Sequence, residues 1–196
     1  FGLDMRGRST IMRESFRSTQ PITEFAVNLL HRLSPASDLH DHKELIALGL
    51  IERMERVGEE WLRVSFNQVQ GPNPYFQRFD SRGAEMTAIG KHLAHLISKE
   101  GVLASDICLI YNGKSVVRHL ETHLAPAMAK LGVELSVQTN RPFERQSNTL
   151  LVTTSHSYKG YDAEVVLIPC VDQYTTQDGQ ILSANLYVAM TRARSV

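Results

Sequence analysis

The stretch that decides the fold reads Leu151-Val-Thr-Thr-Ser-His-Ser-Tyr-Lys-Gly-Tyr-Asp-Ala-Glu-Val-Val-Leu-Ile-Pro169. Two apolar runs enclose a polar loop that contains a glycine, and this is the pattern of a strand, a loop and a second strand. A further stretch reads Asn185-Leu-Tyr-Val-Ala-Met-Thr-Arg-Ala-Arg194. Its apolar residues recur at helical spacing, so we expect an amphipathic helix that ends in two arginines, with Arg192 on the flank of the buried stripe.

Outward from these stretches, strand patterns alternate with helix patterns. The expected strands are Thr10 to Met12, Trp61 to Phe66, Ile107 to Tyr111, Glu134 to Gln138, Leu150 to Thr153 and Glu164 to Ile168. The expected helices begin at Pro21, span His40 to Gly58, cover Met86 to Ile97, and run from Ser115 to Leu131 with a kink at Pro126. Such alternation predicts an α/β fold with a doubly wound, mainly parallel sheet flanked by helices.

Size and composition indicate a globular protein that stays in the cytoplasm. The chain has 196 residues, 42% of them hydrophobic, which suffices for the core of one domain. No apolar run approaches the ~18 residues of a membrane span, and the first residues do not have the pattern of a signal peptide. Cys108 and Cys170 both lie in apolar, strand-like runs. We therefore expect buried free thiols in a reducing cytoplasm.

The net charge of zero excludes the overall basic field of a stand-alone DNA-binding protein, but it leaves room for a local basic groove. Three motifs resemble those of UvrD/Rep-type superfamily I helicases. Thr154-Ser-His-Ser-Tyr-Lys-Gly-Tyr-Asp162 resembles motif V, and Tyr187-Val-Ala-Met-Thr-Arg-Ala193 resembles motif VI. Glu14-Ser-Phe-Arg-Ser-Thr-Gln-Pro-Ile22 resembles motif IV. A weaker match joins Gly71-Pro-Asn-Pro74 to the strand Asp106 to Tyr111, so the resemblance covers nearly the whole chain.

The resemblance implies that residues 1–196 form one C-terminal RecA-like lobe, incomplete at both ends. In this family a large accessory domain follows a stretch like Phe143-Glu-Arg-Gln146, whereas here motif V begins almost at once. The phosphate-binding and Mg²⁺-binding motifs belong to an N-terminal RecA-like lobe that this sequence does not include. The expected ligands are ATP and Mg²⁺, bound mainly by that first lobe, and single-stranded nucleic acid, most simply DNA.

Arg17 and Arg192 are the catalytic residues that the resemblance implies, because the family's arginines at these positions reach the γ-phosphate of ATP. Hydrolysis builds negative charge on phosphate oxygens, and a permanently charged planar donor stabilises it. A solvated arginine at a helix C-terminus is the alternative interpretation for Arg192, and it is the one we adopt for Arg194.

Motif V implies two further sets of contacts. Gly160 and Asp162 correspond to the nucleotide-binding end, although Asp162 stands where the family has glutamate and Ala163 where it has phenylalanine. The residues expected to contact a single strand are Thr154, His156 and Lys159 through its phosphates, and Tyr158 by stacking on a base.

The remaining sequence patterns give weaker evidence of function. Gly113-Lys114-Ser115 resembles the end of a phosphate-binding loop, but the opening glycine is missing and one residue separates it from the preceding strand. The pairs His119/His123, His40/His42 and His92/His95 lack a third ligand, so we expect no metal site. A helicase-like module that binds partners or nucleic acid without turnover remains the alternative function, and a self-sufficient phosphate-loop enzyme is a third.

Overall fold

The computed structural model describes residues 18–33, 40–65, 67–138 and 146–195. Its centre is a four-stranded parallel sheet in the order β4-β5-β3-β6. The strands are β3 (Ile107–Tyr111), β4 (Glu134–Val137), β5 (Thr149–Thr154) and β6 (Val165–Leu167). The predicted α/β fold with a mainly parallel sheet flanked by helices is confirmed.

β3 lies inside the sheet and is buried along its whole length, which explains its unbroken apolar sequence. Its odd-numbered residues Ile107, Leu109 and Tyr111 pack with α3 (Arg82–Ser98) and with the helical segment that follows β3. Its even-numbered residues Cys108 and Ile110 belong to a second cluster on the other side. Because successive side chains of a strand point to opposite faces of the sheet, β3 contributes to two hydrophobic clusters.

The helix expected from Ser115 to Leu131 is interrupted in the structure. It consists of α4 (Lys114–His119), the π-helical turn η3 (Leu120–Leu124) and α5 (Ala125–Ala129). Pro126 has no N–H to donate and its ring would clash with the carbonyl four residues earlier, so the preceding turn widens. The kink predicted at Pro126 is therefore found one turn earlier, as a π-helical turn.

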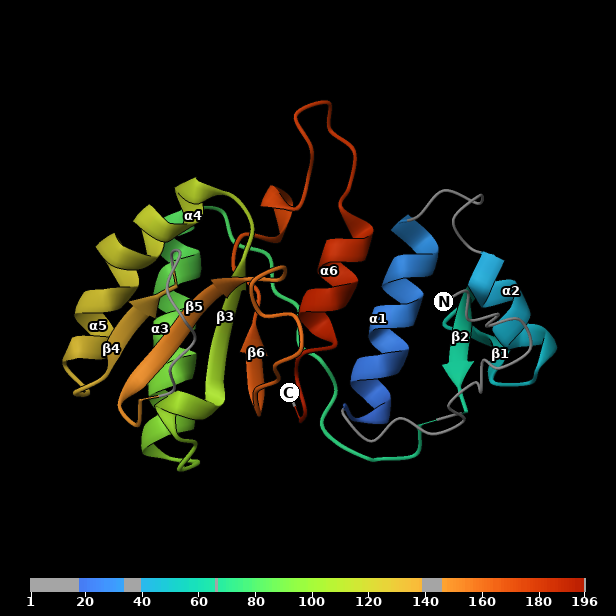
Figure 1. The fold of residues 1–196 in the computed structure, drawn as a ribbon, viewed down its shortest axis with the longest axis horizontal. Coiled ribbons are helices and arrows are strands. Elements are labelled where there is room, and N and C mark those ends of the chain that lie inside the picture. The colour runs from blue at the N-terminus through green and yellow to red at the C-terminus, as the bar shows by residue number, and fades with distance from the viewer. Residues whose placement is uncertain (1–17, 34–39, 66, 139–145, 196) are drawn as a thin grey trace, which may run out of the picture.

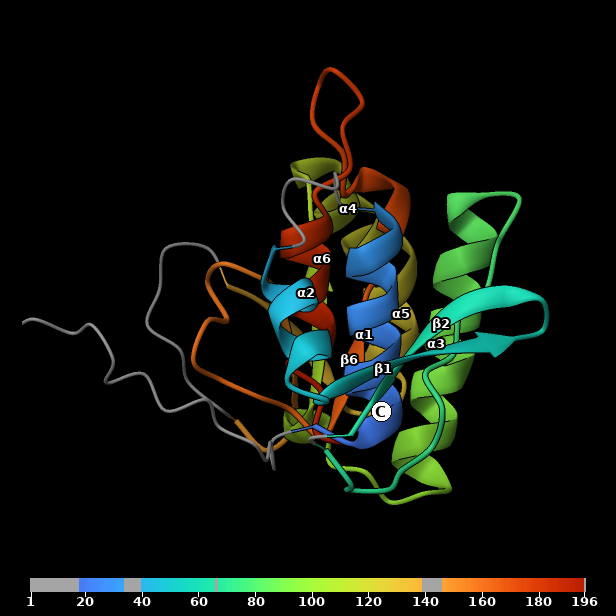
Figure 2. The ribbon, with the colours of Figure 1, turned by 90° about the vertical axis from the view of Figure 1, so that its right-hand side faces the viewer.

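The second cluster joins the sheet to α6 (Ser183–Met190) and α1 (Gln20–Leu33). Leu186 and Ala189 of α6 are buried with Cys108 and Ile110, and Leu29 and Leu33 of α1 pack against the same cluster. Figure 1 shows the resulting order along the long axis, in which the sheet is followed by α6, α1 and a small β-hairpin. Figure 2 views the molecule from the hairpin side, with the hairpin in front of α1.

The helix predicted from His40 to Gly58 is wrong beyond its first half. α2 (His40–Ala47) ends before Gly49, whose φ of +70° breaks the helix, and β1 (Ile51–Arg56) then pairs antiparallel with β2 (Glu59–Val64). Ile51 is directly opposite Val64, and both are buried against Val27 of α1. Most residues between them are charged and exposed, and this composition led to the prediction of a helix.

A buried asparagine attaches this hairpin to α1. The Asn28 side chain accepts a hydrogen bond from the backbone N–H of Leu62 at 2.8 Å and donates one to the Leu62 carbonyl, also at 2.8 Å. It therefore satisfies both backbone groups of one β2 residue, as a neighbouring strand would. No helix among the described residues is long and apolar enough to cross a membrane.

Candidate functional site

The loop that matches motif V is a compact turn at the carboxyl end of β5. The Thr154 hydroxyl accepts a hydrogen bond from the Ser157 backbone N–H at 3.2 Å and contacts the Ser157 hydroxyl at 3.1 Å. The Tyr158 N–H closes the turn by donating to the Thr154 carbonyl at 3.0 Å. Thr154 thus holds the loop in shape, whereas His156 and Lys159 are exposed on it.

Tyr158 and Tyr161 of the motif V loop lie in different environments. Tyr158 is 1% exposed, and its hydroxyl donates to the Asp162 carbonyl at 2.7 Å. A ring buried to this extent cannot receive a base, so the expected stacking role of Tyr158 does not fit the structure. Tyr161 is 43% exposed and its ring lies on that of Tyr158, with centroids 5.8 Å apart.

The loop then returns to the sheet beside the end of α6. Gly160 has a φ of +93°, a conformation that side chains with a Cβ rarely adopt. Beyond it, Ala163 forms a parallel bridge with Ala193, in which the Ala163 N–H donates to the Arg192 carbonyl at 3.0 Å. The Arg194 N–H donates to the Ala163 carbonyl at 2.8 Å. Motifs V and VI are therefore joined directly through their backbones.

Arg192 lies just after α6 and is partly buried. Its Nε–H donates to the Val188 carbonyl at 3.1 Å, and its Nη1 donates to the Tyr161 carbonyl at 3.4 Å. Both acceptors are backbone carbonyls, and these two contacts orient the guanidinium. The side chain thus spans from the helix end to the motif V loop.

Arg194 is exposed, as predicted for a solvated arginine, and it also has acidic neighbours. Its Nη2 lies 3.2 Å from Glu164 Oε2, and its Nε lies 3.7 Å from Asp162 Oδ1. All three side chains remain partly exposed, so each pair contributes little to stability. The pairing nevertheless gives the Asp162 carboxylate a cationic neighbour from motif VI.

The residues that follow Arg17 join the same junction, although Arg17 itself lies outside the described residues. The Ser18 hydroxyl donates to the Thr191 carbonyl at 3.4 Å, and the Thr19 N–H donates to the Arg194 carbonyl at 3.2 Å. The segment of motif IV that the structure describes therefore meets the end of motif VI.

Asn67 supports this junction, and sequence reasoning missed it. Its buried amide donates to the Ser18 carbonyl at 2.7 Å and to the Thr23 hydroxyl at 2.8 Å. The only sequence signal is one asparagine after a predicted strand, which is typical of any turn.

A scan with protein-family models found no match, and a search of curated proteins found none. Among solved structures, the chain matches the C-terminal domain of a possible DNA helicase from Lactobacillus plantarum WCFS1. The TM-score is 0.51 at 18% sequence identity, and the match covers 92% of this chain and 83% of that chain.

The chain has the fold of this helicase domain. At this identity the likeness concerns the fold and assigns no role to any residue.

Gly113-Lys114-Ser115 does not form a phosphate-binding loop in this fold. Only Asn112 separates β3 from Gly113, and its amide donates to the Gln173 carbonyl at 2.6 Å. The Ser115 hydroxyl lies 3.5 Å from the Gln173 side-chain oxygen. These contacts attach the start of α4 to the turn η4 (Val171–Gln173), and a connection as short as Asn112 is too short to wrap backbone amides around a phosphate.

The pair His119/His123 lies on the helical segment that follows β3, outside this site. His119 and His123 stack with ring centroids 6.2 Å apart, and within the described part of the chain no three His, Cys, Asp or Glu side chains could hold a metal ion.

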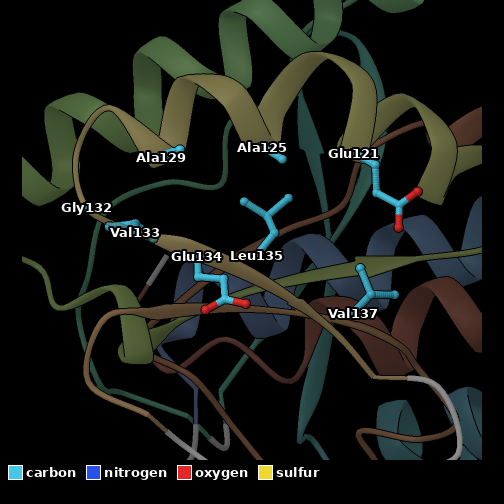
Figure 3. A pocket seen from close by; sticks show the side chains of 8 residues that line it. All are labelled: Glu121, Ala125, Ala129, Gly132, Val133, Glu134, Leu135 and Val137. Carbon is cyan, nitrogen blue, oxygen red and sulfur yellow. The ribbon is translucent and has the colours of Figure 1, made fainter.

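A groove of about 390 Å³ runs between β4 and the helical segment η3–α5 (Figure 3). Ala125 and Ala129 of the helix leave this space above Leu135, at the edge opposite β6.

Proposed function

We propose that this chain is the C-terminal motor lobe of an ATP-dependent superfamily I helicase or translocase acting on single-stranded DNA. One observation carries the proposal: motifs V and VI meet through the Ala163–Ala193 bridge, with the Arg192 guanidinium held across the junction. The surface proposed for the nucleotide then lies within a few residues of the surface proposed for the strand. A motor that couples ATP hydrolysis to movement along a strand requires such proximity.

Arg192 is the proposed catalytic arginine of this lobe, and Arg17 is the second. An arginine finger must be oriented before the transition state forms, and it must keep its charge. The two carbonyl contacts of Arg192 orient its guanidinium, and an arginine side chain stays protonated in proteins. Ser18 and Thr19 contact residues 191 and 194, so motif IV enters the described structure beside the same helix end.

Gly160 and Asp162 are the proposed contacts of this lobe with the ATP nucleotide, and the phosphates and Mg²⁺ are bound mainly by an N-terminal RecA-like lobe. The Asp162 carboxylate, 3.7 Å from the Arg194 guanidinium, offers oxygens that can accept hydrogen bonds from ribose hydroxyls.

Thr154, His156 and Lys159 are the proposed strand contact. The loop follows the carboxyl end of a parallel strand, where open α/β sheets bind their ligands. Thr154 supports the turn, and the exposed His156 and Lys159 are suited to phosphate oxygens. Such contacts tolerate any base sequence and weaken as salt rises.

The test is the salt dependence of strand binding by the full-length protein. In Lys159→Ala, the affinity for a thymidine oligonucleotide should fall, and the slope of log K against log salt should decrease by roughly 0.7, the release expected for one phosphate contact on a single strand. His156→Ala should lower affinity and strand-stimulated ATPase activity while basal ATPase activity remains. Lys130→Ala removes a matched exposed charge outside the motifs and should change neither. Unchanged affinity and slope in both loop variants would refute the strand contact.

A further inference from the structure

We infer that Tyr161 binds a nucleobase by stacking, at the mouth of the motif V loop. The inference rests on the proposed function, because it adds a base contact to a surface proposed for phosphates. It also replaces Tyr158, whose ring is buried. The ligand class is any nucleobase, carried either by a single strand or by the ATP nucleotide.

The ring of Tyr161 is supported from behind. Tyr158 is 1% exposed and fixed by its hydroxyl bond to the Asp162 carbonyl, and the Tyr161 ring stacks on it at 5.8 Å with an interplanar angle of 28°. With 43% of Tyr161 exposed, a base could extend this pair as a third stacked ring. Offset stacking of this kind is favourable for aromatic rings and indifferent to base identity.

The backbone of Tyr161 is held at both of its polar groups. Its N–H donates to the Tyr158 carbonyl at 3.1 Å, and its carbonyl accepts from Arg192 Nη1 at 3.4 Å. A tyrosine has few rotatable bonds, so a ring on a fixed backbone loses little freedom when a ligand binds. The Arg192 contact also connects the proposed base platform to the proposed catalytic arginine.

The charges of the same turn complete the binding surface. His156 and Lys159 are exposed within five residues of Tyr161, so one nucleotide unit can place its phosphate on these side chains and its base on the ring. Backbone-tracking charges combined with an aromatic platform are the usual way to bind single strands without reading their sequence.

The experiment compares ligands with and without a base, using the full-length protein. Tyr161→Ala should weaken binding of a thymidine oligonucleotide about tenfold, and binding of an abasic oligonucleotide of equal length should not change. Tyr161→Phe keeps the ring and should bind as the wild type does. Tyr75→Ala removes another exposed tyrosine, outside the motifs, and serves as the control.

The second arm distinguishes the two sources of the base. If Tyr161→Ala instead weakens a non-hydrolysable ATP analogue but not inorganic tripolyphosphate, then the base on the ring is that of the nucleotide. Equal losses with and without a base, or no loss with any ligand, would overturn the inference. Because Lys159→Ala should weaken both oligonucleotides alike, failure of the strand proposal remains distinguishable from failure of the stacking inference.

Discussion

Cys170 combines a buried thiol with an unusual backbone. Its φ of +55° places it in the left-handed region before η4, so it does not lie in a strand as its apolar surroundings suggest. The Glu85 carboxylate accepts its backbone N–H at 2.7 Å. Burial, together with this carboxylate, raises the pKa of the Cys170 thiol to about 12.

We expect both cysteines to react slowly with thiol reagents in the native protein. Cys108 and Cys170 are free and buried, and thiolate is the reactive form. Because the Cys170 pKa lies far above neutral pH, almost no thiolate is present at pH 8. Labelling followed by mass spectrometry should show two slow sites that become fast in denaturant. Rapid native labelling, or a mass two hydrogens lower without reductant, would contradict this placement.

Val57 is strained at the tip of the hairpin. It is 97% exposed and has a φ of +54°, a conformation that is unfavourable for a β-branched residue. Its neighbour Gly58 also has positive φ, so the two-residue turn is of a type that favours asparagine at the first position.

Val57→Asn should therefore stabilise the protein by about 1 kcal/mol, the order of the left-handed penalty that asparagine relieves. Val57→Thr is the matched control, because threonine is polar but keeps the branched Cβ and should gain nothing. Chemical denaturation measures both. A gain in the threonine variant as large as that in the asparagine variant would attribute the effect to surface polarity, not to backbone strain.

Among the elements, the segment after β2 packs tightly on the start of α1. A Cβ added to Gly71 would lie 2.4 Å from Thr19 Cγ2, and Thr19 is a buried, β-branched residue with little room to move. Gly71→Ala should therefore destabilise the protein by about 1–3 kcal/mol, as overpacking does.

Gly83 provides the opposite case, because a Cβ there meets nothing within 4 Å and the residue lies in the first turn of α3. Gly83→Ala should stabilise by about 0.5–1 kcal/mol through helix propensity. Midpoints of thermal unfolding should move in opposite directions for the two variants. An unchanged or raised midpoint for Gly71→Ala would mean that the Gly71–Thr19 contact does not constrain the fold.

Local signals were enough to predict the strands of the parallel sheet, since the apolar run of β3 is read directly from neighbouring residues. The second hairpin strand was predicted at Trp61 to Phe66, but the first was missed, because Ile51 is a strand residue only through its pairing with Val64 and its burial against Val27. For the same reason the stacking role was predicted for Tyr158, whose ring is buried, and not for Tyr161. Their spacing is visible, but which ring is buried depends on how the turn folds onto the core.

For the whole molecule, the central feature is the junction where three distant segments meet. Residues 18–19, 161–164 and 191–195 are joined by backbone hydrogen bonds and by the Arg192 and Arg194 side chains. The motifs predicted this meeting only through their resemblance to a family. The pairing of Arg194 with Asp162 and Glu164 has no local signal, since 30 to 32 residues separate the partners along the chain.

The most direct measurement is the kcat for ATP hydrolysis of the full-length protein carrying Arg192→Ala. We predict a decrease of at least ~10²-fold with the unfolding midpoint unchanged, because the residue acts on charge that develops in the transition state. Arg192→Lys should not restore the rate, since a point charge does not reproduce the planar donor. Arg194→Ala, which removes an arginine paired with carboxylates, should cost far less. An Arg192→Ala enzyme with wild-type kcat and normal stimulation by single-stranded DNA would contradict the motor assignment of this lobe.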